Sequence, residues 1–502
     1  MDLGSEHALA DDLPTPATTP ARETTQSRTT LLLVLVTLAG AWLRLSHLGS
    51  KSLWLDEGAT VALARASWRH FAWVWWYGEA NLQTVYFLLM RGWIHGGQSE
   101  AWLRLPSALC GIASLPLLYV VARRFMRAGP ALASATLLAF SPAHVYYSQE
   151  ARGYTLAILL VLLSSYFFVR EVEEGRRRDW VLWTVASLLA FYSHDFVALV
   201  LVAQVCSLFF RKTAPAIWRR VIFCGMLILA AAIPGLTYVF RAAPENLHFI
   251  WMPRASPKEL WHLGMFFGGS GVKVFLALIL WIAGFVAIAR TRRRDAESFW
   301  RRMLIVSWAV VPAAITALVS LRHPIFMQRY LIFSLPATIM LAAMGMIALR
   351  RLHLGVVLVV ALCAMSLPAI MKGYHKPRED WRAASNSILA SAQAGDAVVF
   401  FPFYTRTMLD YYRDRDRQTP PALHVFAPQF YDGGEDERDL LRALNSDPHQ
   451  FRHVWVVLYG SGAHVDDLEQ RNPGLASKLQ SAFDPPQVRR FADIAVLEFG
   501  KW

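Results

Sequence analysis

Two adjacent carboxylates stand shortly after the first long apolar run of the chain. Asp56 and Glu57 lie in residues 52–58, with the sequence SLWLDEG. A carboxylate within hydrogen-bond reach of a hydroxyl can act as a general base, and carboxylate oxygens also bind Mg²⁺ or Mn²⁺. Neighbouring side chains point apart on a helix or strand, so we expect different roles for the two. Asp56 could instead only cap an interfacial helix, and the sequence leaves both interpretations open.

A further acidic residue that could take part in catalysis, Glu150, lies between two apolar runs, in residues 148–154 (SQEARGY). Glu150 and Arg152 could form an ion pair at a helix boundary. Arg152 could alternatively bind a phosphate, because a guanidinium makes two parallel hydrogen bonds to phosphate where lysine cannot. Tyr154 follows at the expected membrane boundary and is a candidate substrate-binding residue.

Two more turns carry polar side chains. Arg329 and Tyr330 end the stretch 322–330, where the arginine either binds phosphate or extends to the interface and the tyrosine is a candidate substrate contact. His194 and Asp195 interrupt an apolar stretch. A single histidine there could merely be a hydrogen-bonded structural residue, but the aspartate beside it favours substrate binding.

Further cations lie close to the same predicted boundary. Arg44 stands in the last part of the first apolar run, and Lys51 and Arg104 lie near the interface. Each of these side chains could simply extend to the lipid head groups and bind no ligand. Together with Arg152 and Arg329 they could form a cationic pocket for the phosphate of a lipid donor.

Several common catalytic motifs are absent. The sequence contains no GxSxG, HExxH or GxGxxG, which argues against the usual soluble hydrolase, metalloprotease and dinucleotide-binding classes. The glycine-rich residues 267–271 (FGGSG) lack the Lys-Ser/Thr of a phosphate-binding loop, so we expect a turn that enters a helix.

The composition shows which kind of protein must position these side chains. Of 502 residues 55% are hydrophobic, 17% are charged, and 4 are cysteines. The mean hydropathy is +0.32. So much apolar surface excludes a disordered chain, and so few cysteines exclude a disulfide-stapled one. The composition indicates a polytopic helical membrane protein.

Eleven apolar runs approach the length of about 20 residues that a membrane helix needs. We predict a disordered cytoplasmic tail over residues 1–29 and a membrane domain over residues 30–372. The predicted spans are 30–48, 101–122, 131–147, 151–169, 180–194, 196–210, 221–240, 272–289, 303–321, 330–349 and 353–371.

Basic residues mark every second connection between these runs. They cluster at 123–127, 170–178, 211–220, 290–302 and 350–351, which should therefore be cytoplasmic. Because the net charge of +13 is placed in this way, it reflects topology in the cell membrane and not a nucleic-acid partner. The N-terminus is then cytoplasmic, and residues 49–100, here called the first loop, face outward. This loop is rich in Trp and Tyr, which predicts one or two amphipathic helices along the interface.

The composition becomes polar after residue 372. Short β-branched or aromatic runs at 398–401, 454–458 and 494–497 alternate with helical patterns, which predicts a soluble α/β domain over residues 373–502 on the extracytoplasmic side.

The motifs described above resemble those of the GT-C superfamily of integral-membrane glycosyltransferases. The chain is most similar to the bacterial proteins of glycosyltransferase family 39, relatives of protein O-mannosyltransferases and of aminoarabinose transferases. The resemblance covers roughly residues 30–400, and the matching blocks are 43–57, 100–107, 147–154, the turns at His194 and at 328–330, and 378–382.

The resemblance implies transfer of a sugar, such as a mannose or a pentose, from a polyprenyl-phosphate carrier to an extracytoplasmic glycan, lipid or protein acceptor. A direct displacement by the acceptor hydroxyl would invert the anomeric configuration. Asp56 would be the catalytic base, and Glu57 and Glu150 would be acidic partners that bind acceptor or a divalent cation. Arginines would hold the donor phosphate. The predicted outer domain does not resemble the β-trefoil domain of the eukaryotic mannosyltransferases.

Two other functions compete with this one. A transporter or flippase of lipid-linked sugars would have broken helices in matching halves and charges at mid-membrane, whereas here no internal repeat is visible and the charges gather at turns. A scaffold or sensor that uses the outer domain to bind a partner leaves Asp56, Glu57 and the outer arginines unexplained.

Overall fold

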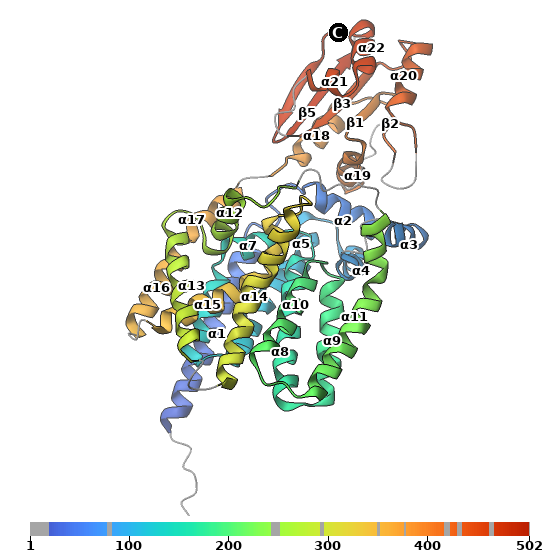
Figure 1. The fold of residues 1–502 in the computed structure, drawn as a ribbon. Coiled ribbons are helices and arrows are strands. Elements are labelled where there is room, and N and C mark those ends of the chain that lie inside the picture. Colours follow the sequence, from blue (N-terminus) through green and yellow to red (C-terminus); the bar gives the residue numbers. More distant parts are fainter. Residues whose placement is uncertain are drawn as a thin grey trace, which may run out of the picture.

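The computed structural model describes residues 20–77, 83–241, 252–291, 296–348, 352–375, 378–415, 422–428, 434–460 and 466–500. A bundle of helices carries a smaller sheet domain at one end, and the helices of the first loop lie where the two meet (Figure 1). The helices of the bundle are α1 (Pro20–Leu45), α5 (Glu100–Ala122), α6 (Ala128–Ala139), α7 (Pro142–Ser148), α8 (Tyr154–Glu174), α9 (Arg177–Phe191), α10 (Val197–Ser207), α11 (Pro215–Arg241), α13 (Val272–Thr291), α14 (Ala296–Ser320), α15 (Leu335–Ala348), α16 (Leu352–Ala364) and α17 (Leu367–His375).

Each of the eleven predicted spans coincides with helix. Within the described ranges, eight helical segments are long and apolar enough to cross a membrane. The remaining three spans correspond to α6 with α7, to α9, and to α10 with its 3₁₀ extension Leu208–Phe210. Many large apolar side chains on the bundle surface are exposed, as expected for helices whose solvent is hydrocarbon.

Several predicted boundaries are wrong. Helix α1 begins at Pro20, so residues 20–29 are helical and not part of an unstructured tail, while residues 1–19 lie outside the described residues. The span 131–147 is broken, because the Ser141 side chain accepts a hydrogen bond from the backbone of His144 and Pro142 starts a new helix. The span 353–371 is divided into α16 and α17, with Pro368 in the first turn of the second.

In its described residues, 49–77 and 83–100, the first loop contains three α-helices where one or two were predicted. These are α2 (Leu55–Arg65), α3 (Trp68–Tyr77) and α4 (Thr84–Trp93). Helix α3 leaves Trp68, Trp73 and Trp76 exposed, the pattern expected of an aromatic face at a head-group layer. A further helix that the sequence did not predict, α12 (Pro257–Gly268), precedes α13. The two are joined by the glycine-rich turn, where Gly269 and Gly271 have positive φ.

The predicted α/β domain is present and has five strands in the part of it that the structure describes. The strands are β1 (Ala397–Phe401), β2 (His424–Phe426), β3 (His453–Tyr459), β4 (Gln487–Phe491) and β5 (Ile494–Gly500), in the order β2-β1-β3-β5-β4. Strand β1 runs parallel to β2 and β3, whereas β5 is antiparallel to β3 and β4. The helices of the domain are α18 (Trp381–Ser391), α19 (Arg406–Arg415), α20 (Glu437–Ser446), α21 (Asp466–Arg471) and α22 (Pro473–Ala482).

The sheet has a different apolar cluster on each face. Val399 and Val456 contribute to the cluster that includes residues of α20 and α22. Their neighbours Val398 and Trp455 point the opposite way, because side chains alternate along a strand. They belong to a cluster that also contains residues of α18, α19 and the first loop.

The first loop and the sheet domain therefore share one apolar core. Val61 of α2, Tyr86 of α4 and Met408 of α19 are all buried in this shared core. Helix α2 approaches α19 so closely that a Cβ at Gly58 would collide with Met408. The boundary at residue 372 separates two compositions, but it does not separate two independent cores.

Candidate active site beneath the sheet domain

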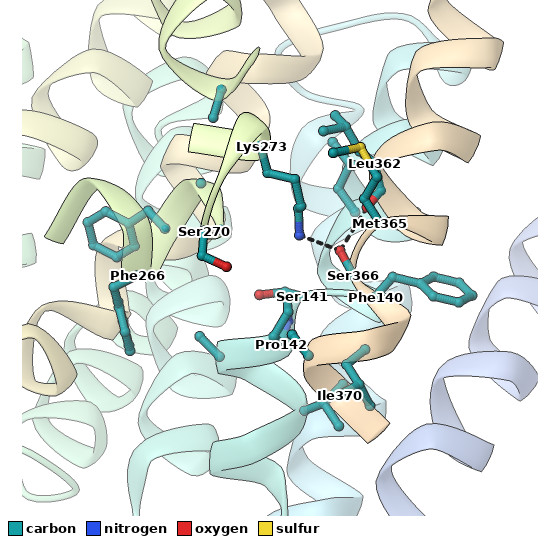
Figure 2. A pocket seen from close by; sticks show the side chains of 18 of the residues that line it. Phe140, Ser141, Pro142, Phe266, Ser270, Lys273, Leu362, Met365, Ser366 and Ile370 are labelled. Atoms are coloured by element: carbon teal, nitrogen blue, oxygen red, sulfur yellow. Dashed lines mark hydrogen bonds between the residues drawn. The ribbon is translucent and has the colours of Figure 1, made fainter. Parts of the chain in front are cut away.

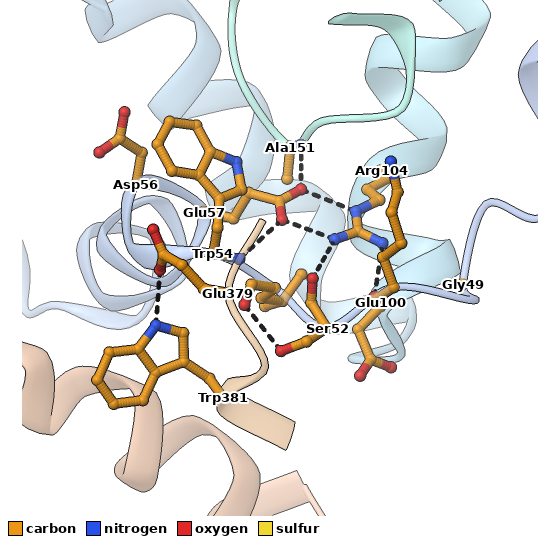
Figure 3. A network of polar contacts seen from close by, with 12 residues as sticks. Gly49, Ser52, Trp54, Asp56, Glu57, Glu100, Arg104, Ala151, Glu379 and Trp381 are labelled. Carbon is orange, nitrogen blue, oxygen red and sulfur yellow. Dashed lines mark hydrogen bonds and ion pairs between the residues drawn. The ribbon is translucent and has the colours of Figure 1, made fainter. Parts of the chain in front are cut away.

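The carboxylate of Glu57 pairs with Arg104 inside the protein, and both side chains are buried (Figure 3). Helix α5 positions Arg104, and α2 positions Glu57. The guanidinium donates five hydrogen bonds: Nε to Glu57 Oε1 (2.8 Å), Nη2 to Glu57 Oε2 (2.7 Å) and to the carbonyl of Ser52 (2.9 Å), and Nη1 to the carbonyls of Leu48 (3.0 Å) and Lys51 (2.9 Å). An arginine has five N–H groups, so Arg104 has no donor left for a ligand.

Glu57 is also fully engaged. Besides Arg104, its carboxylate accepts hydrogen bonds from the backbone N–H of Trp54 (3.2 Å) and of Ala151 (2.7 Å). The predictions that Arg104 binds a donor phosphate and that Glu57 binds acceptor or metal are therefore wrong for this arrangement. The pair instead joins the first loop, α5 and the turn before α8.

Asp56 faces away from this pair, as the adjacent positions predicted (Figure 3). It lies in the first turn of α2, and about a third of its side chain is exposed. Arg329 Nη2 lies 4.0 Å from Asp56 Oδ2. Arg152 Nη1 donates to the backbone carbonyl of Asp56 (3.3 Å) and to Thr60 Oγ1 (3.4 Å).

The structure thus brings Asp56, Arg152 and Arg329 together from three separate segments. The Nε group of Arg152 is buried and has no hydrogen-bond partner in the described part of the chain. A buried N–H without a partner costs free energy, and an anionic ligand would satisfy it.

Three ring side chains of the helix bundle pack together near Asp56, Arg152 and Arg329. The His194 ring lies 5.6 Å from that of Tyr154 and 5.1 Å from that of Tyr330, measured between centroids. Its Nδ1 lies 3.0 Å from Asp195 Oδ1. His194 is buried and contacts both tyrosine rings, so the four predicted substrate-binding residues lie next to one another.

Arg378 is a further cation at this site that the sequence analysis did not select. Its guanidinium stacks on the Trp54 ring at 3.9 Å, and Arg329 lies over the same ring at 5.7 Å. Burial lowers the pKa of Arg378, but the neighbouring Tyr146, and after it Glu150 and Asp56, raise this pKa above its usual value. The only signal in the sequence was the block 378–382, which begins the outer domain.

Glu379 connects the sheet domain to α2, the helix that carries Asp56. Its Oε2 accepts hydrogen bonds from the backbone N–H of Leu55 (2.9 Å) and from Trp381 Nε1 (2.7 Å), and its Oε1 accepts one from the Tyr459 hydroxyl (2.8 Å). A carboxylate at the start of a helix is stabilised by the free N–H groups there. The sheet domain thus holds the start of α2, immediately before Asp56.

The other predicted cations have different surroundings. Arg44 is wholly buried, donating to the carbonyls of Gly40, Leu138 and Ala139 and contacting His144 Nδ1 at 2.8 Å. These contacts fix α1 against α6 and α7 and leave only the buried Nε of Arg44 without a hydrogen-bond partner among the described residues, so they give no support to the prediction that Arg44 binds a donor phosphate. Lys51 Nζ donates to the carbonyl of Gly373 (3.0 Å), and burial together with Arg104 lowers the pKa of Lys51.

The predicted pair of metal ligands does not form. Asp56 and Glu57 diverge, and both oxygens of Glu57 are occupied by N–H groups. Among the residues that the structure describes, no group of three or more His, Cys, Asp or Glu side chains converges. These residues do not fit a divalent cation held jointly by Asp56 and Glu57.

Glu150 is a buried carboxyl between α7 and α8, and neither of its oxygens has a hydrogen bond of standard geometry among the described residues. Burial first, and then the charge of Glu57, raise the pKa of Glu150 to about 7. A carboxyl whose pKa is raised on folding stabilises the folded state while it is protonated. That stability disappears as the pH rises from the unfolded pKa through the folded one.

We therefore expect Glu150→Gln to change how stability depends on pH. Relative to this variant, the wild-type protein should lose about 3 kcal/mol of unfolding free energy between about pH 4.5 and pH 7. Unfolding of both proteins in detergent, followed over this range, measures the difference. Parallel curves for the two proteins would show that Glu150 does not titrate there.

Comparison with known proteins agrees with this architecture. Residues 84–238 match the sequence model of a family described as dolichyl-phosphate-mannose-protein mannosyltransferase. A search of the curated proteins found no significant match.

Solved structures match almost the whole chain. ArnT from Cupriavidus metallidurans in the apo state superposes with a TM-score of 0.60 at 15% identity, over 96% of this chain and 98% of that one. The same protein bound to undecaprenyl phosphate gives 0.57 at 16% identity, over 93% and 97%. The oligosaccharyltransferase of Archaeoglobus fulgidus, in complex with Zn and sulfate, gives 0.54 at 12% identity, over 92% and 73%.

These likenesses establish the fold. The chain has the GT-C architecture of a multi-pass helical membrane protein with a small sheet domain at its C-terminus, and the fold class predicted from the sequence is confirmed.

Proposed function

We propose that the chain is a membrane glycosyltransferase that moves a sugar from a polyprenyl-phosphate carrier to an acceptor hydroxyl on the extracytoplasmic side. The observation that carries the proposal is a single, partly exposed carboxylate, Asp56, beside Arg152 and Arg329 at the membrane boundary. The family match and the binding of undecaprenyl phosphate by ArnT support a lipid-linked donor.

The residues suggest a direct displacement. The acceptor oxygen attacks the anomeric carbon and loses its proton to the Asp56 carboxylate. The bond between that carbon and the phosphate oxygen breaks, and the lipid phosphate leaves with its negative charge. Arg152, Arg329 and Arg378 stabilise this charge as it develops. One displacement of this kind inverts the anomeric configuration.

The experiment that tests this function uses the purified protein in lipid vesicles. We expect release of polyprenyl phosphate from one of a panel of polyprenyl-phosphate sugars, matched by a glycosylated acceptor detected by mass spectrometry. Comparison of envelope glycans and glycolipids from cells with and without the gene identifies the sugar and the acceptor. Movement of the intact lipid-linked sugar across the vesicle membrane, without cleavage, would instead support a flippase.

The arginines can be tested separately from the base. Arg152→Lys and Arg329→Lys keep the charge but lose two-point hydrogen bonding. Each should cost roughly 1.5–3 kcal/mol, or about one to two decades in donor affinity or rate. Steady-state kinetics with a polyprenyl-phosphate sugar measures the effect.

Arg322→Lys is the matched control, because Arg322 is exposed on the same turn as Arg329. It should behave like the wild type. Normal kinetics in both Arg152→Lys and Arg329→Lys would remove these arginines from the donor site.

The proposal also requires a defined orientation. In a variant without its four native cysteines, Arg177→Cys should be labelled only from the cytoplasm, since the connection before α9 is basic. Ser446→Cys, at the end of α20, should be labelled from outside the cell. An impermeant thiol reagent applied to intact cells and to inverted vesicles measures both. Labelling of position 177 in intact cells contradicts the orientation.

A further inference from the structure

A cavity of about 420 Å³ lies in the same half of the bundle as the candidate active site, between α7, α12, α13, α15, α16 and α17. Its wall is mainly apolar and aromatic, with Phe140, Phe266, Leu362, Met365 and Ile370 among the lining residues (Figure 2). Walls of this kind suit a hydrocarbon chain. Tyr146 and Tyr147 also line it, and the Tyr147 ring lies 4.8 Å from that of Tyr154, so the cavity adjoins the site of Asp56.

One charged side chain, Lys273, is present among the lining residues of this cavity. It stands in the first turn of α13 and is 8% exposed. Its amino group donates one hydrogen bond, to Ser366 Oγ at 2.6 Å, and Ser366 donates onward to the carbonyl of Leu362 (2.7 Å). No carboxylate pairs with Lys273 within the described ranges, so two of its three N–H groups have no acceptor there.

Hydroxyl groups surround the same space. Figure 2 shows the amino group of Lys273 together with the side-chain oxygens of Ser141, Ser270 and Ser366, all directed toward the centre of the cavity. An ammonium group and several hydroxyls are donors that a phosphate accepts well.

A buried ammonium without a counterion is costly, because its lost hydration is not replaced. Within or beside a membrane such a group is generally functional. We propose that this cavity binds a phosphate-bearing lipid, whose phosphate pairs with Lys273 and whose hydrocarbon chain occupies the apolar part. This is a site distinct from the arginines beside Asp56.

Two kinds of lipid have both the phosphate and the hydrocarbon chain that this cavity would bind. A polyprenyl phosphate has a phosphate monoester on one branched chain, and a bilayer phospholipid such as phosphatidylglycerol has a phosphate diester on two chains. Binding at Lys273 requires no sugar transfer, so this site can exist even if the proposed glycosyltransferase activity does not.

Photoaffinity labelling of the full-length protein tests the proposal and separates the two lipids. The probes are a polyprenyl phosphate and a phosphatidylglycerol, each with a diazirine in its chain, and the corresponding polyprenol without phosphate. We expect one of the phosphorylated probes to label peptides that line the cavity, namely residues 265–281 and 362–374. The polyprenol should label them at least about tenfold less, since it lacks the charge-assisted contact.

Variants show whether Lys273 is responsible. Lys273→Gln retains a donor for Ser366 and should lower the labelling at least about tenfold, whereas Lys273→Arg should restore most of it. The matched control is Lys372→Gln, because Lys372 is exposed on α17 and does not line the cavity. Its labelling should equal that of the wild type.

If Lys273→Gln loses labelling by the polyprenyl phosphate probe, the bound lipid is a carrier lipid. If it loses labelling by the phosphatidylglycerol probe, the bound lipid is a bilayer phospholipid. Unchanged labelling in a Lys273→Gln protein that unfolds at the wild-type temperature overturns the proposal. Labelling that is absent from both cavity peptides in the wild type overturns it as well. Neither result depends on turnover, so the outcome is separable from that of the glycosyltransferase assay.

Discussion

Asp56→Asn should lower the turnover of a polyprenyl-phosphate sugar by at least about 10²-fold, the scale of a general base in catalysis. Asparagine keeps the shape of the side chain but cannot accept the proton of the acceptor hydroxyl. Single-turnover kinetics with the purified protein measures the loss. Donor affinity should change little, because the arginines remain.

Two controls make this result specific. The melting temperature of Asp56→Asn should match that of the wild type, since the Asp56 side chain is partly exposed and its ion pair with Arg329 is long, at 4.0 Å. Asp414→Asn removes an exposed carboxylate that pairs with Arg65 and should leave turnover intact. If Asp56→Asn retains wild-type turnover, Asp56 only begins a helix.

Arg104→Leu should be the most damaging single change to stability near the site. It leaves the buried Glu57 carboxylate without its partner, and three backbone carbonyls lose their donor. Breaking a buried pair by removing one member costs about 3–5 kcal/mol. Since Glu57 lies in the first turn of α2 directly after Asp56, activity should fall with stability. Thermal unfolding in detergent and the glycosyltransferase assay measure the two effects.

The double variant Glu57→Leu/Arg104→Leu should regain part of the lost stability, because it removes the unpaired charge. Arg65→Leu is the matched control: it breaks an exposed ion pair of the same region and should cost at most about 1 kcal/mol. Equal melting temperatures for Arg104→Leu and Arg65→Leu would mean that the buried pair contributes no more than a surface one.

Long apolar runs made the bundle predictable, because a membrane helix must satisfy its own backbone and leaves a continuous signal. Hydropathy did not predict the breaks within a single span. Ser141 and Pro142 divide a span that hydropathy alone treats as continuous. In the sheet domain, β1, β3 and β5 were anticipated from their apolar composition. By contrast, β2 has only three residues and β4 is largely polar, so neither has a strong pattern.

The candidate site was predicted in part. Asp56, Arg152 and Arg329 do lie together, and the sequence suggested this because all were assigned to turns on one side. The partner of Glu57 was not predictable: Arg104 lies 47 positions away, and only the packing of α2 against the bundle pairs them. Arg44 lies apart from these residues, since proximity to a membrane boundary does not show whether the Nη groups of a guanidinium already donate to backbone carbonyls.

The core shared by the first loop and the sheet domain has a consequence for how this protein can be regulated and engineered. Glu379 holds the start of α2, and Met408 packs where Gly58 leaves room. A rigid-body tilt of the sheet domain would therefore carry the carboxylate of Asp56 with it, so a ligand or antibody that binds the distant face of the sheet has a mechanical route to the reaction centre. For the same reason a chimera that exchanges the sheet domain between relatives must exchange residues 49–100 as well, or the two surfaces will not interlock.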